Sequence, residues 1–178
     1  STLSDVYSAI CSAIGTLRGP LHGGANEAAM KLILQYKNED DAENGILDLL
    51  KQRKKIMGFG HRVYKVCDPR SDIIKECSRQ LSLHPSYGQP KLYKISQRIE
   101  QVMKREKNMF PNLDFYAASA YHQCNIPTFM FTPIFVIART AGWASHIIEQ
   151  RANNKLIRPG AKYTGPSPKS YTPISSRL

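Results

Sequence analysis

Residues 58–61 read Gly-Phe-Gly-His, and residues 62–70 continue as Arg-Val-Tyr-Lys-Val-Cys-Asp-Pro-Arg. Two glycines around an aromatic residue permit a sharp turn and let backbone N–H groups come close to a ligand. His61, at the end of this turn, carries an imidazole that can exchange a proton near neutral pH. Asp68 followed by Pro69 predicts a helix N-cap and a first-turn proline.

Arg70 would then lie at the start of a helix, where the helix dipole disfavours a positive charge. We therefore expect its guanidinium to bind an anion. A Gly-x-Gly pattern is a weak signal by itself, and an ordinary loop before a helix explains residues 58–70 equally well. The remaining sequence has to decide between these two interpretations.

The composition predicts a packed chain. The 178 residues are 42% hydrophobic, which suits one domain or one and a half. Lysine and arginine number 25 against 14 aspartates and glutamates, which gives a formal net charge of +11. A polyanion, a small ligand with several negative charges, or an acidic surface on a partner or a missing segment would each balance this charge. No lysine- or arginine-rich block is long enough for a nucleic-acid-binding arm, so we expect no nucleic-acid partner.

The four cysteines, Cys11, Cys67, Cys77 and Cys124, show no CxxC spacing. We expect them to be buried thiols in a reducing compartment and not a zinc site or a disulfide framework. No apolar run is long enough to span a bilayer, so no membrane partner is expected. Residues 1–5 match neither a signal peptide nor a transit peptide, and the immediate helix start indicates the middle of a longer chain.

Apolar residues recur at helical spacing along most of the chain and predict an all-α fold. Glycine- and proline-containing breaks separate helices over approximately 3–17, 26–36, 40–50, 69–81, 92–107, 115–124 and 134–151. Pro20 is predicted to end the first helix, and Asn26 and Thr132 are predicted N-caps. A short pair of strands around residues 62–66 is the one β-type element expected, and the proline-rich segment 158–178 is predicted to be an extended tail.

Two histidines and one aspartate are the candidates for catalysis. His22 and His61 each adjoin glycines in predicted loops, and Asp114 begins a helix in a stretch, residues 108–138, that is nearly free of carboxylates. Without further cysteine or histidine at ligand spacing, these groups fit acid–base chemistry better than a metal site. Each also has a structural explanation, because a loop histidine or a helix N-cap needs no catalytic role.

Three arginines stand beside turns or inside apolar helices and are candidates for anion binding: Arg70, Arg139 and Arg158. Arg139 interrupts the apolar run 134–138, where an unpaired charge is costly. A carboxylate or phosphate bound in a bidentate manner would satisfy it. Glu149 or a partner chain would serve as well.

Three motifs, taken together, closely resemble those of the citrate synthase family. They are Gly-Pro-Leu-His-Gly-Gly-Ala-Asn-Glu at 19–27, Gly-Phe-Gly-His at 58–61 with Asp-Pro-Arg at 68–70, and Asn-Leu-Asp-Phe-Tyr at 112–116. Their order and spacing match the family from Ser4 to about Gly165, which is nearly the whole chain. Within the family, the sequence is most similar to the 2-methylcitrate synthases at residues 131–135, 149–154 and 163–165.

The resemblance implies an all-α homodimer, of which this chain covers only about the second half. Residues 1–23 and 126–178 would belong to the family's large domain. Residues 24–125 would form the small domain, which binds CoA and closes over the substrate. The rest of the large domain is missing from the chain, together with an upstream histidine that helps to hold oxaloacetate. The tail would wrap around the partner subunit.

The resemblance also implies a reaction, the condensation of propionyl-CoA with oxaloacetate followed by hydrolysis of the thioester. Asp114 would remove the α-proton of the thioester, and His22 would donate a hydrogen bond to the thioester carbonyl. His61 would polarise the ketone of oxaloacetate. The oxaloacetate carboxylates would be bound by Arg70, Arg139 and, from the other subunit, Arg158.

The CoA adenine would lie against the backbone of Lys55, Ile56, Met57, Gly58 and Phe59. The resemblance implies no metal and no cofactor, because the CoA thioester is itself a substrate. The alternatives are a citrate synthase that uses acetyl-CoA, an inactive fragment that keeps the dimerising or CoA-binding part, and a basic helical domain that binds nucleic acid. The lack of aromatic-rich basic patches disfavours the last of these. A cytoplasmic location is favoured over the mitochondrial matrix.

Overall fold

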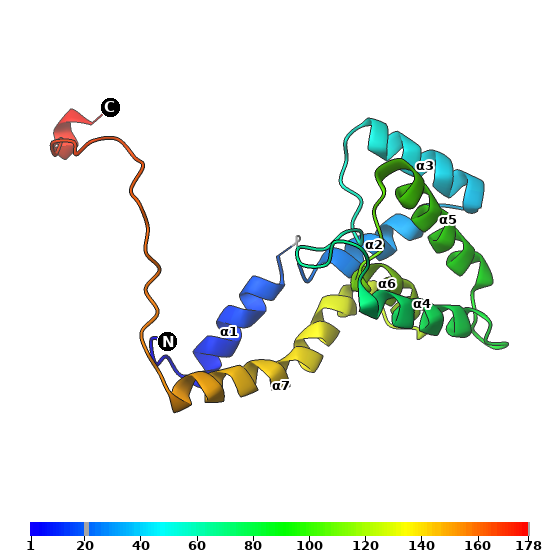
Figure 1. Cartoon of the computed structure of the whole chain (residues 1–178), viewed down its shortest axis with the longest axis horizontal. Helices are drawn as coiled ribbons and strands as arrows, with labels where there is room; N and C mark the ends of the chain where they lie inside the picture. Colours follow the sequence, from blue (N-terminus) through cyan, green and yellow to red (C-terminus); the bar gives the residue numbers. More distant parts are fainter. Residues whose placement is uncertain (20–21, 178) are drawn as a thin grey trace.

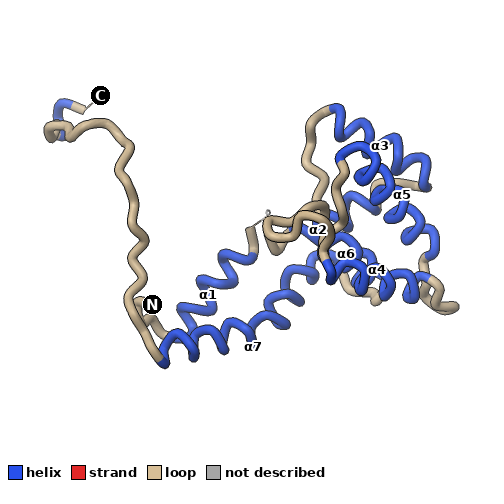
Figure 2. The backbone as a smooth tube through the Cα atoms, viewed as in Figure 1, coloured by secondary structure: helices blue, strands red, loops and turns tan. Residues whose placement is uncertain are grey.

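The computed structural model describes residues 1–19 and 22–177, and its regular structure is helical (Figures 1 and 2). The α-helices are α1 (Val6–Leu17), α2 (Ala25–Ile33), α3 (Glu39–Lys51), α4 (Pro69–Ser82), α5 (Pro90–Lys107), α6 (Leu113–Gln123) and α7 (Phe131–Ala152). Single 3₁₀ turns span Thr128–Met130 and Ile174–Ser176. The predicted all-α fold is confirmed.

The predicted strand pair around residues 62–66 is wrong. This segment forms bends, and the one β-type pairing within the described residues is an isolated antiparallel bridge between Phe59 and Pro111. The backbone N–H groups of Val63 and Tyr64 donate to the His61 side chain, so they are not free to pair with another strand.

Side-chain caps explain where several helices begin. Asn38 accepts a hydrogen bond from the backbone of Asp41 at 2.8 Å, Asp68 from that of Arg70 at 3.1 Å, and Asn112 from that of Asp114 at 3.0 Å. Each cap satisfies one of the backbone donors that a helix start leaves unpaired.

Two predicted caps are wrong. Helix α2 starts one residue before Asn26, which is fully buried, and the N-cap position is Gly24. Thr132 lies inside α7, and its hydroxyl oxygen lies 2.6 Å from Glu27 Oε1 and 3.0 Å from Gly23 O, so its one proton is shared between these two acceptors. In both cases a preceding turn starts the helix early, so the residue with the capping side chain becomes an internal one. Pro20 lies outside the described residues.

Helices α2–α6 form the compact part of the molecule, in which α4 and α2 pack on α6, and α3 packs on α5 (Figure 1). It holds nearly all of the hydrophobic core. The fully buried side chains include Met30, Ile33, Ile46, Ile99, Val102, Phe115 and Tyr116. Helix α5 alone contributes seven buried residues, because its apolar positions repeat along one face.

Helices α1 and α7 form an arm that runs away from the compact part, and residues 153–177 continue from it as an extended tail (Figures 1 and 2). The two helices contact each other. Within the described residues, α1 buries only Leu17 and α7 only Phe131. Large apolar side chains on the arm therefore remain exposed, such as Ile137 at 71% and Ile148 at 69%.

The four cysteines are exposed and unpaired by disulfides, so the prediction of buried thiols is wrong. Cys11 and Cys77 lie on outward faces of α1 and α4, and Cys67 and Cys124 lie where a loop meets a helix. Free cysteine is usually among the most buried residue types, so the exposure of all four is a departure that their residue type does not predict. Among the described helices, none combines the length and apolar character needed to cross a bilayer.

Candidate active site

The Gly58-Phe59-Gly60 turn packs against the start of α6. Gly58 and Gly60 have φ angles of +91° and +75°, which other residues adopt only with strain. A Cβ atom on Gly58 would also lie 2.9 Å from Cβ of Phe115. Between the two glycines, the ring of Phe59 packs on Phe115 with centroids 4.6 Å apart. The backbone N–H of Gly60 donates to Phe110 O, so the turn is also bonded to the segment that precedes α6.

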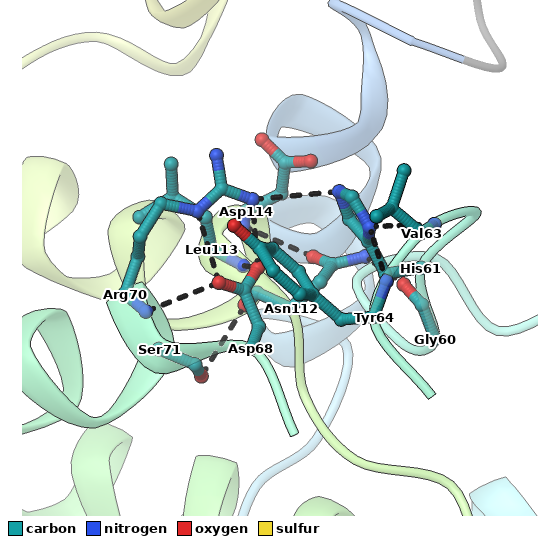
Figure 3. Close-up of polar contacts among 10 residues, drawn as sticks. All are labelled: Gly60, His61, Val63, Tyr64, Asp68, Arg70, Ser71, Asn112, Leu113 and Asp114. Carbon is teal, nitrogen blue, oxygen red and sulfur yellow. Dashed lines mark hydrogen bonds and ion pairs between the residues drawn. The ribbon is translucent and has the colours of Figure 1, made fainter. Parts of the chain in front are cut away.

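The imidazole of His61, which follows this turn, is held in one orientation by backbone hydrogen bonds. The Nδ1 atom accepts hydrogen bonds from the backbone of Val63 at 3.1 Å and of Tyr64 at 3.2 Å. In the neutral ring, the proton is therefore assigned to Nε2. That atom lies 3.5 Å from Nη2 of Arg70 (Figure 3). Two N–H donors cannot satisfy each other, so this pair is suited to binding an oxygen acceptor placed between them.

Arg70 is held by the buried carboxylate of Asp68. Its Nε donates to Oδ1 at 2.9 Å and its Nη2 to Oδ2 at 2.8 Å, a bidentate ion pair (Figure 3). Oδ2 also accepts from the backbone of Leu113 at 3.1 Å. The Arg70 guanidinium and these N–H groups hold the pKa of Asp68 below its usual range although burial opposes them. The anion that Arg70 pairs with in this structure is Asp68, the N-cap of its own helix, and the expected role of Arg70 in binding a substrate carboxylate stays a prediction.

Asp114 lies at the second position of α6. Its backbone N–H donates to the side chain of Asn112, and no contact from the other residues drawn in Figure 3 reaches its carboxylate. Burial raises the pKa of Asp114, while the nearby charges of His22 and Arg70 act in the opposite direction. A carboxylate with a raised pKa is a stronger base than an exposed aspartate.

A pocket of about 210 Å³ brings five predicted residues together: His22, His61, Arg70, Asp114 and Arg139. The compact part supplies three of them. His22 comes from the turn between α1 and α2, and Arg139 from the arm. Apolar side chains complete the wall, including Leu17, Leu113 and Phe135. Arg158, the sixth predicted residue of this set, lies in the tail and is exposed, so the structure does not bring it to the pocket.

Residues 55–59 line a second pocket, of about 590 Å³, which shares His22, His61 and Asp114 with the first. Ile56 and Phe59 are buried there, whereas Lys55 is exposed. The predicted CoA-binding segment and the predicted acid–base residues therefore border one continuous region. Among the described residues, no three His, Cys, Asp or Glu side chains gather closely enough to hold a metal ion.

One of the two alternatives for Arg139, an ion pair with Glu149, is wrong, and the other, a pairing with a partner chain, stays a prediction. Arg139 is exposed on α7, and the Glu149 carboxylate instead lies 3.4 Å from Nδ1 of His146. The sequence did not predict the roles of Asp68 and Asn112 as links between distant segments. Asp68 was predicted as an N-cap, whereas the structural explanation of Asp114 as an N-cap is wrong, because Asn112 caps α6. Both capping side chains make a second contact with a segment more than 40 residues away.

Comparison with known proteins agrees with this geometry. Residues 1–160 match the family model described as "Citrate synthase, C-terminal domain". The chain is 52% identical over 177 residues to 2-methylcitrate synthase of Shewanella oneidensis, and 50% identical over 177 residues to citrate synthase 2 of Bacillus subtilis. Each alignment covers 99% of this chain and 47% of the relative.

The fold agrees as well. Citrate synthase from the archaeon Thermoplasma acidophilum, solved as a ternary complex with carboxymethyl coenzyme A and oxaloacetate, superposes with a TM-score of 0.87 at 38% identity, over 99% of this chain and 48% of that one. The chain thus spans about half the length of the relatives it matches. On the sequence match and the shared fold together, the chain belongs to the citrate synthase family, of which it represents the C-terminal domain.

Proposed function

We propose that the full-length protein condenses an acyl-CoA with oxaloacetate and then hydrolyses the thioester. The observation that carries this proposal is the shared pocket, in which Asp114, His22 and His61 lie with Arg70 and Arg139 beside the 55–59 segment. The related Thermoplasma acidophilum structure is a ternary complex with carboxymethyl coenzyme A and oxaloacetate, which supports the same two ligand classes for this chain.

The first chemical step is removal of a proton from the carbon next to the thioester carbonyl. This proton is far too weakly acidic for an ordinary carboxylate, with a pKa of about 4, to remove unaided. Asp114, whose pKa is raised by burial, takes the proton. His22, across the same pocket, donates a hydrogen bond to the thioester oxygen and stabilises the enolate as its charge develops.

The second step is attack of the enolate carbon on the ketone of oxaloacetate. Nε2–H of His61 donates to the ketone oxygen and so makes its carbon more electrophilic. The Arg70 guanidinium, 3.5 Å from that nitrogen, binds a carboxylate of the same molecule. Arg139 binds the substrate from the arm, and we assign Arg158 to the site of a partner subunit in a homodimer. Closure of the compact part over the substrates keeps water out until the carbon–carbon bond has formed.

The acyl donor that we propose is propionyl-CoA, which makes the product 2-methylcitrate. Leu17, Leu113 and Phe135 give the pocket an apolar side next to Asp114, where an additional methyl group can lie. The second candidate is acetyl-CoA, because one relative of nearly equal identity is a citrate synthase. Thiol release with each donor at equal concentration separates the two, and a higher kcat/KM for acetyl-CoA would contradict the propionyl assignment.

The experiment that tests the base is Asp114→Asn in the full-length protein. We expect turnover to disappear while oxaloacetate still binds, because the amide keeps the shape of the side chain but cannot accept the proton. Asp72→Asn is the matched control, since Asp72 is also a first-turn aspartate but is exposed on α4. Retained turnover in Asp114→Asn would remove Asp114 as the base.

An inactive module is the remaining alternative for the 178-residue chain by itself. It predicts that the chain alone releases no thiol from either donor, whereas a protein of the full family length does. The intact mass of the purified protein, compared with 20.1 kDa for this chain, identifies which of the two is being assayed.

A cytoplasmic location is also part of the proposal.

A further inference from the structure

Asn112 connects the two segments that carry His61 and Asp114. Its Nδ2 donates to the carbonyl oxygen of Gly60 at 2.9 Å, and its Oδ1 accepts from the backbone N–H of Asp114 at 3.0 Å (Figure 3). Its own backbone N–H donates to Gly58 O at 2.9 Å. We call the two side-chain bonds the Asn112 bridge.

One end of this bridge is on the backbone of Asp114, and the other is on the residue directly before His61. The Gly60 carbonyl belongs to the peptide group that leads into His61, and the N–H belongs to Asp114 itself. A displacement at either end therefore changes the separation between the imidazole and the carboxylate. The partners also identify the orientation of the amide, because a carbonyl needs the NH₂ group and an N–H needs the oxygen.

A single amide is the side chain that suits both ends. A carboxylate at this position would accept from Asp114 N, but it would face the Gly60 carbonyl without a proton to donate and would place a second negative charge near Asp114. A serine would cap α6 equally well, but its hydroxyl is too short to reach both partners. The requirement for a donor and an acceptor on one planar group goes beyond what an N-cap needs.

We propose that Asn112 is a positioning residue for the condensation, and that its side chain sets the placement of the His61 imidazole relative to the Asp114 carboxylate. The inference rests on the proposed function, because the placement matters only if both groups act on the same pair of substrates. Catalysis is sensitive to such placement, since a displacement of about 1 Å can cost about 100-fold in rate.

The competing explanation is that Asn112 only caps α6. The variant Asn112→Ser separates the two roles, because it keeps a capping hydroxyl for Asp114 N and loses the bond to Gly60 O. Asn38→Ser is the matched control, since Asn38 caps α3 in the same way, at 2.8 Å from Asp41 N, away from the pocket residues. Both variants are made in the full-length protein and assayed by thiol release.

We expect Asn112→Ser to lower kcat by about 10- to 100-fold, with the KM for the acyl-CoA changed by less than about twofold. Asn38→Ser should leave kcat within about twofold, and both variants should lower the melting temperature by similar small amounts. In a His61→Ala background, the serine substitution should add less than about twofold, because the bridge acts through His61.

Two outcomes would overturn the inference: a kcat for Asn112→Ser within twofold of the wild type, or the same fold-loss with and without His61. If the wild-type protein releases no thiol, the proposed function fails, and a second measurement still tests the bridge. The ¹⁵N NMR shifts of the His61 ring report its tautomer and surroundings. They should change in Asn112→Ser and not in Asn38→Ser, and unchanged shifts would exclude a positioning effect on His61.

Discussion

Helices α5 and α7 belong to the compact part and the arm, and they use apolar residues in opposite ways. Helix α5 is strongly charged, yet seven of its 18 residues are buried. Helix α7 has a long apolar run and 22 residues, but it buries only Phe131. Burial thus depends on whether the chain supplies a surface that matches the apolar face, and the number of apolar residues in a helix does not decide it.

The candidate site lies where these two regions meet. His61, Arg70 and Asp114, from the compact part, are held through Asp68, Asn112 and the turn at residues 58–60. Arg139, from the arm, is exposed beside the same pocket. The compact part therefore fixes the arrangement of His61, Arg70 and Asp114, and the position of the arm sets how close the Arg139 side chain lies to them.

The largest contrast between the two regions should appear in folding stability. Phe115 is fully buried and packs on Phe59, so Phe115→Ala should lower the free energy of unfolding by about 3–5 kcal/mol. Ile148 is 69% exposed, and Ile148→Ala in the 178-residue chain should change it by less than about 0.5 kcal/mol. Urea denaturation measures both. Equal losses would contradict the division into a compact part and an arm, and a larger loss for Ile148→Ala in the full-length protein would show that the arm is covered there.

A smaller loss is expected from the ion pair that holds Arg70. Asp68 is fully buried on its side chain, but Arg70 is 46% exposed, so Asp68→Asn should cost about 2–3 kcal/mol, less than the 3–5 kcal/mol of a fully buried pair. Because the pKa of Asp68 is lowered by folding, its contribution is present above the ordinary pKa of about 4 and is lost as the pH falls through the lower folded-state value. Urea denaturation of the wild type and of Asp68→Asn, at pH 7 and at lower pH, measures the contribution of Asp68 to the free energy of unfolding.

The matched control is Glu76→Gln, which removes an exposed pair with Arg79 in the same helix. We expect little change in the free energy of unfolding from this substitution, because exposed ion pairs contribute little. Equal effects of the two substitutions would mean that the burial of Asp68 does not matter.

The next effect is a shift in pH dependence. Burial raises the pKa of Asp114, so the acid limb of kcat for the full-length protein should lie above the ordinary pKa of 3.8 for an aspartate, with activity rising as the carboxylate loses its proton. Arg70 lowers this pKa by its charge, so Arg70→Gln should move the limb to higher pH, whereas Arg70→Lys should move it less. Rates at saturating oxaloacetate measure the limb. A shift to lower pH in Arg70→Gln would contradict the electrostatic assignment.

The smallest effect on stability is expected from the exposed arginines of the arm and tail. Arg139→Ala and Arg158→Ala should change the free energy of unfolding by less than about 0.5 kcal/mol. In the full-length protein, both should raise the KM for oxaloacetate. Mixed dimers that carry Arg158→Ala on one subunit test its assignment to the partner's site. If activity falls only in the site of the mutated subunit itself, that assignment is wrong.

The local structure of several segments could be predicted from the sequence. Helical periodicity predicted the all-α fold, and Asp68-Pro69 predicted the start of α4, because caps and apolar faces depend on residues three or four positions apart. The two glycines of residues 58–60 predicted a sharp turn, and the structure shows positive φ angles at both Gly58 and Gly60. The motif residues that were grouped by resemblance, His22, His61, Arg70, Asp114 and Arg139, also line one pocket.

The tertiary structure alone decided which contacts these local elements make. Asn112 and Gly60 are 52 residues apart, and Asp68 and Leu113 are 45 apart, so no spacing in the sequence predicts their hydrogen bonds. The exposure of the cysteines and the misplaced caps at Asn26 and Thr132 have the same origin. Packing against distant segments sets how far a helix extends and which of its faces is covered, and a residue's type determines what it can bond to but not what it meets.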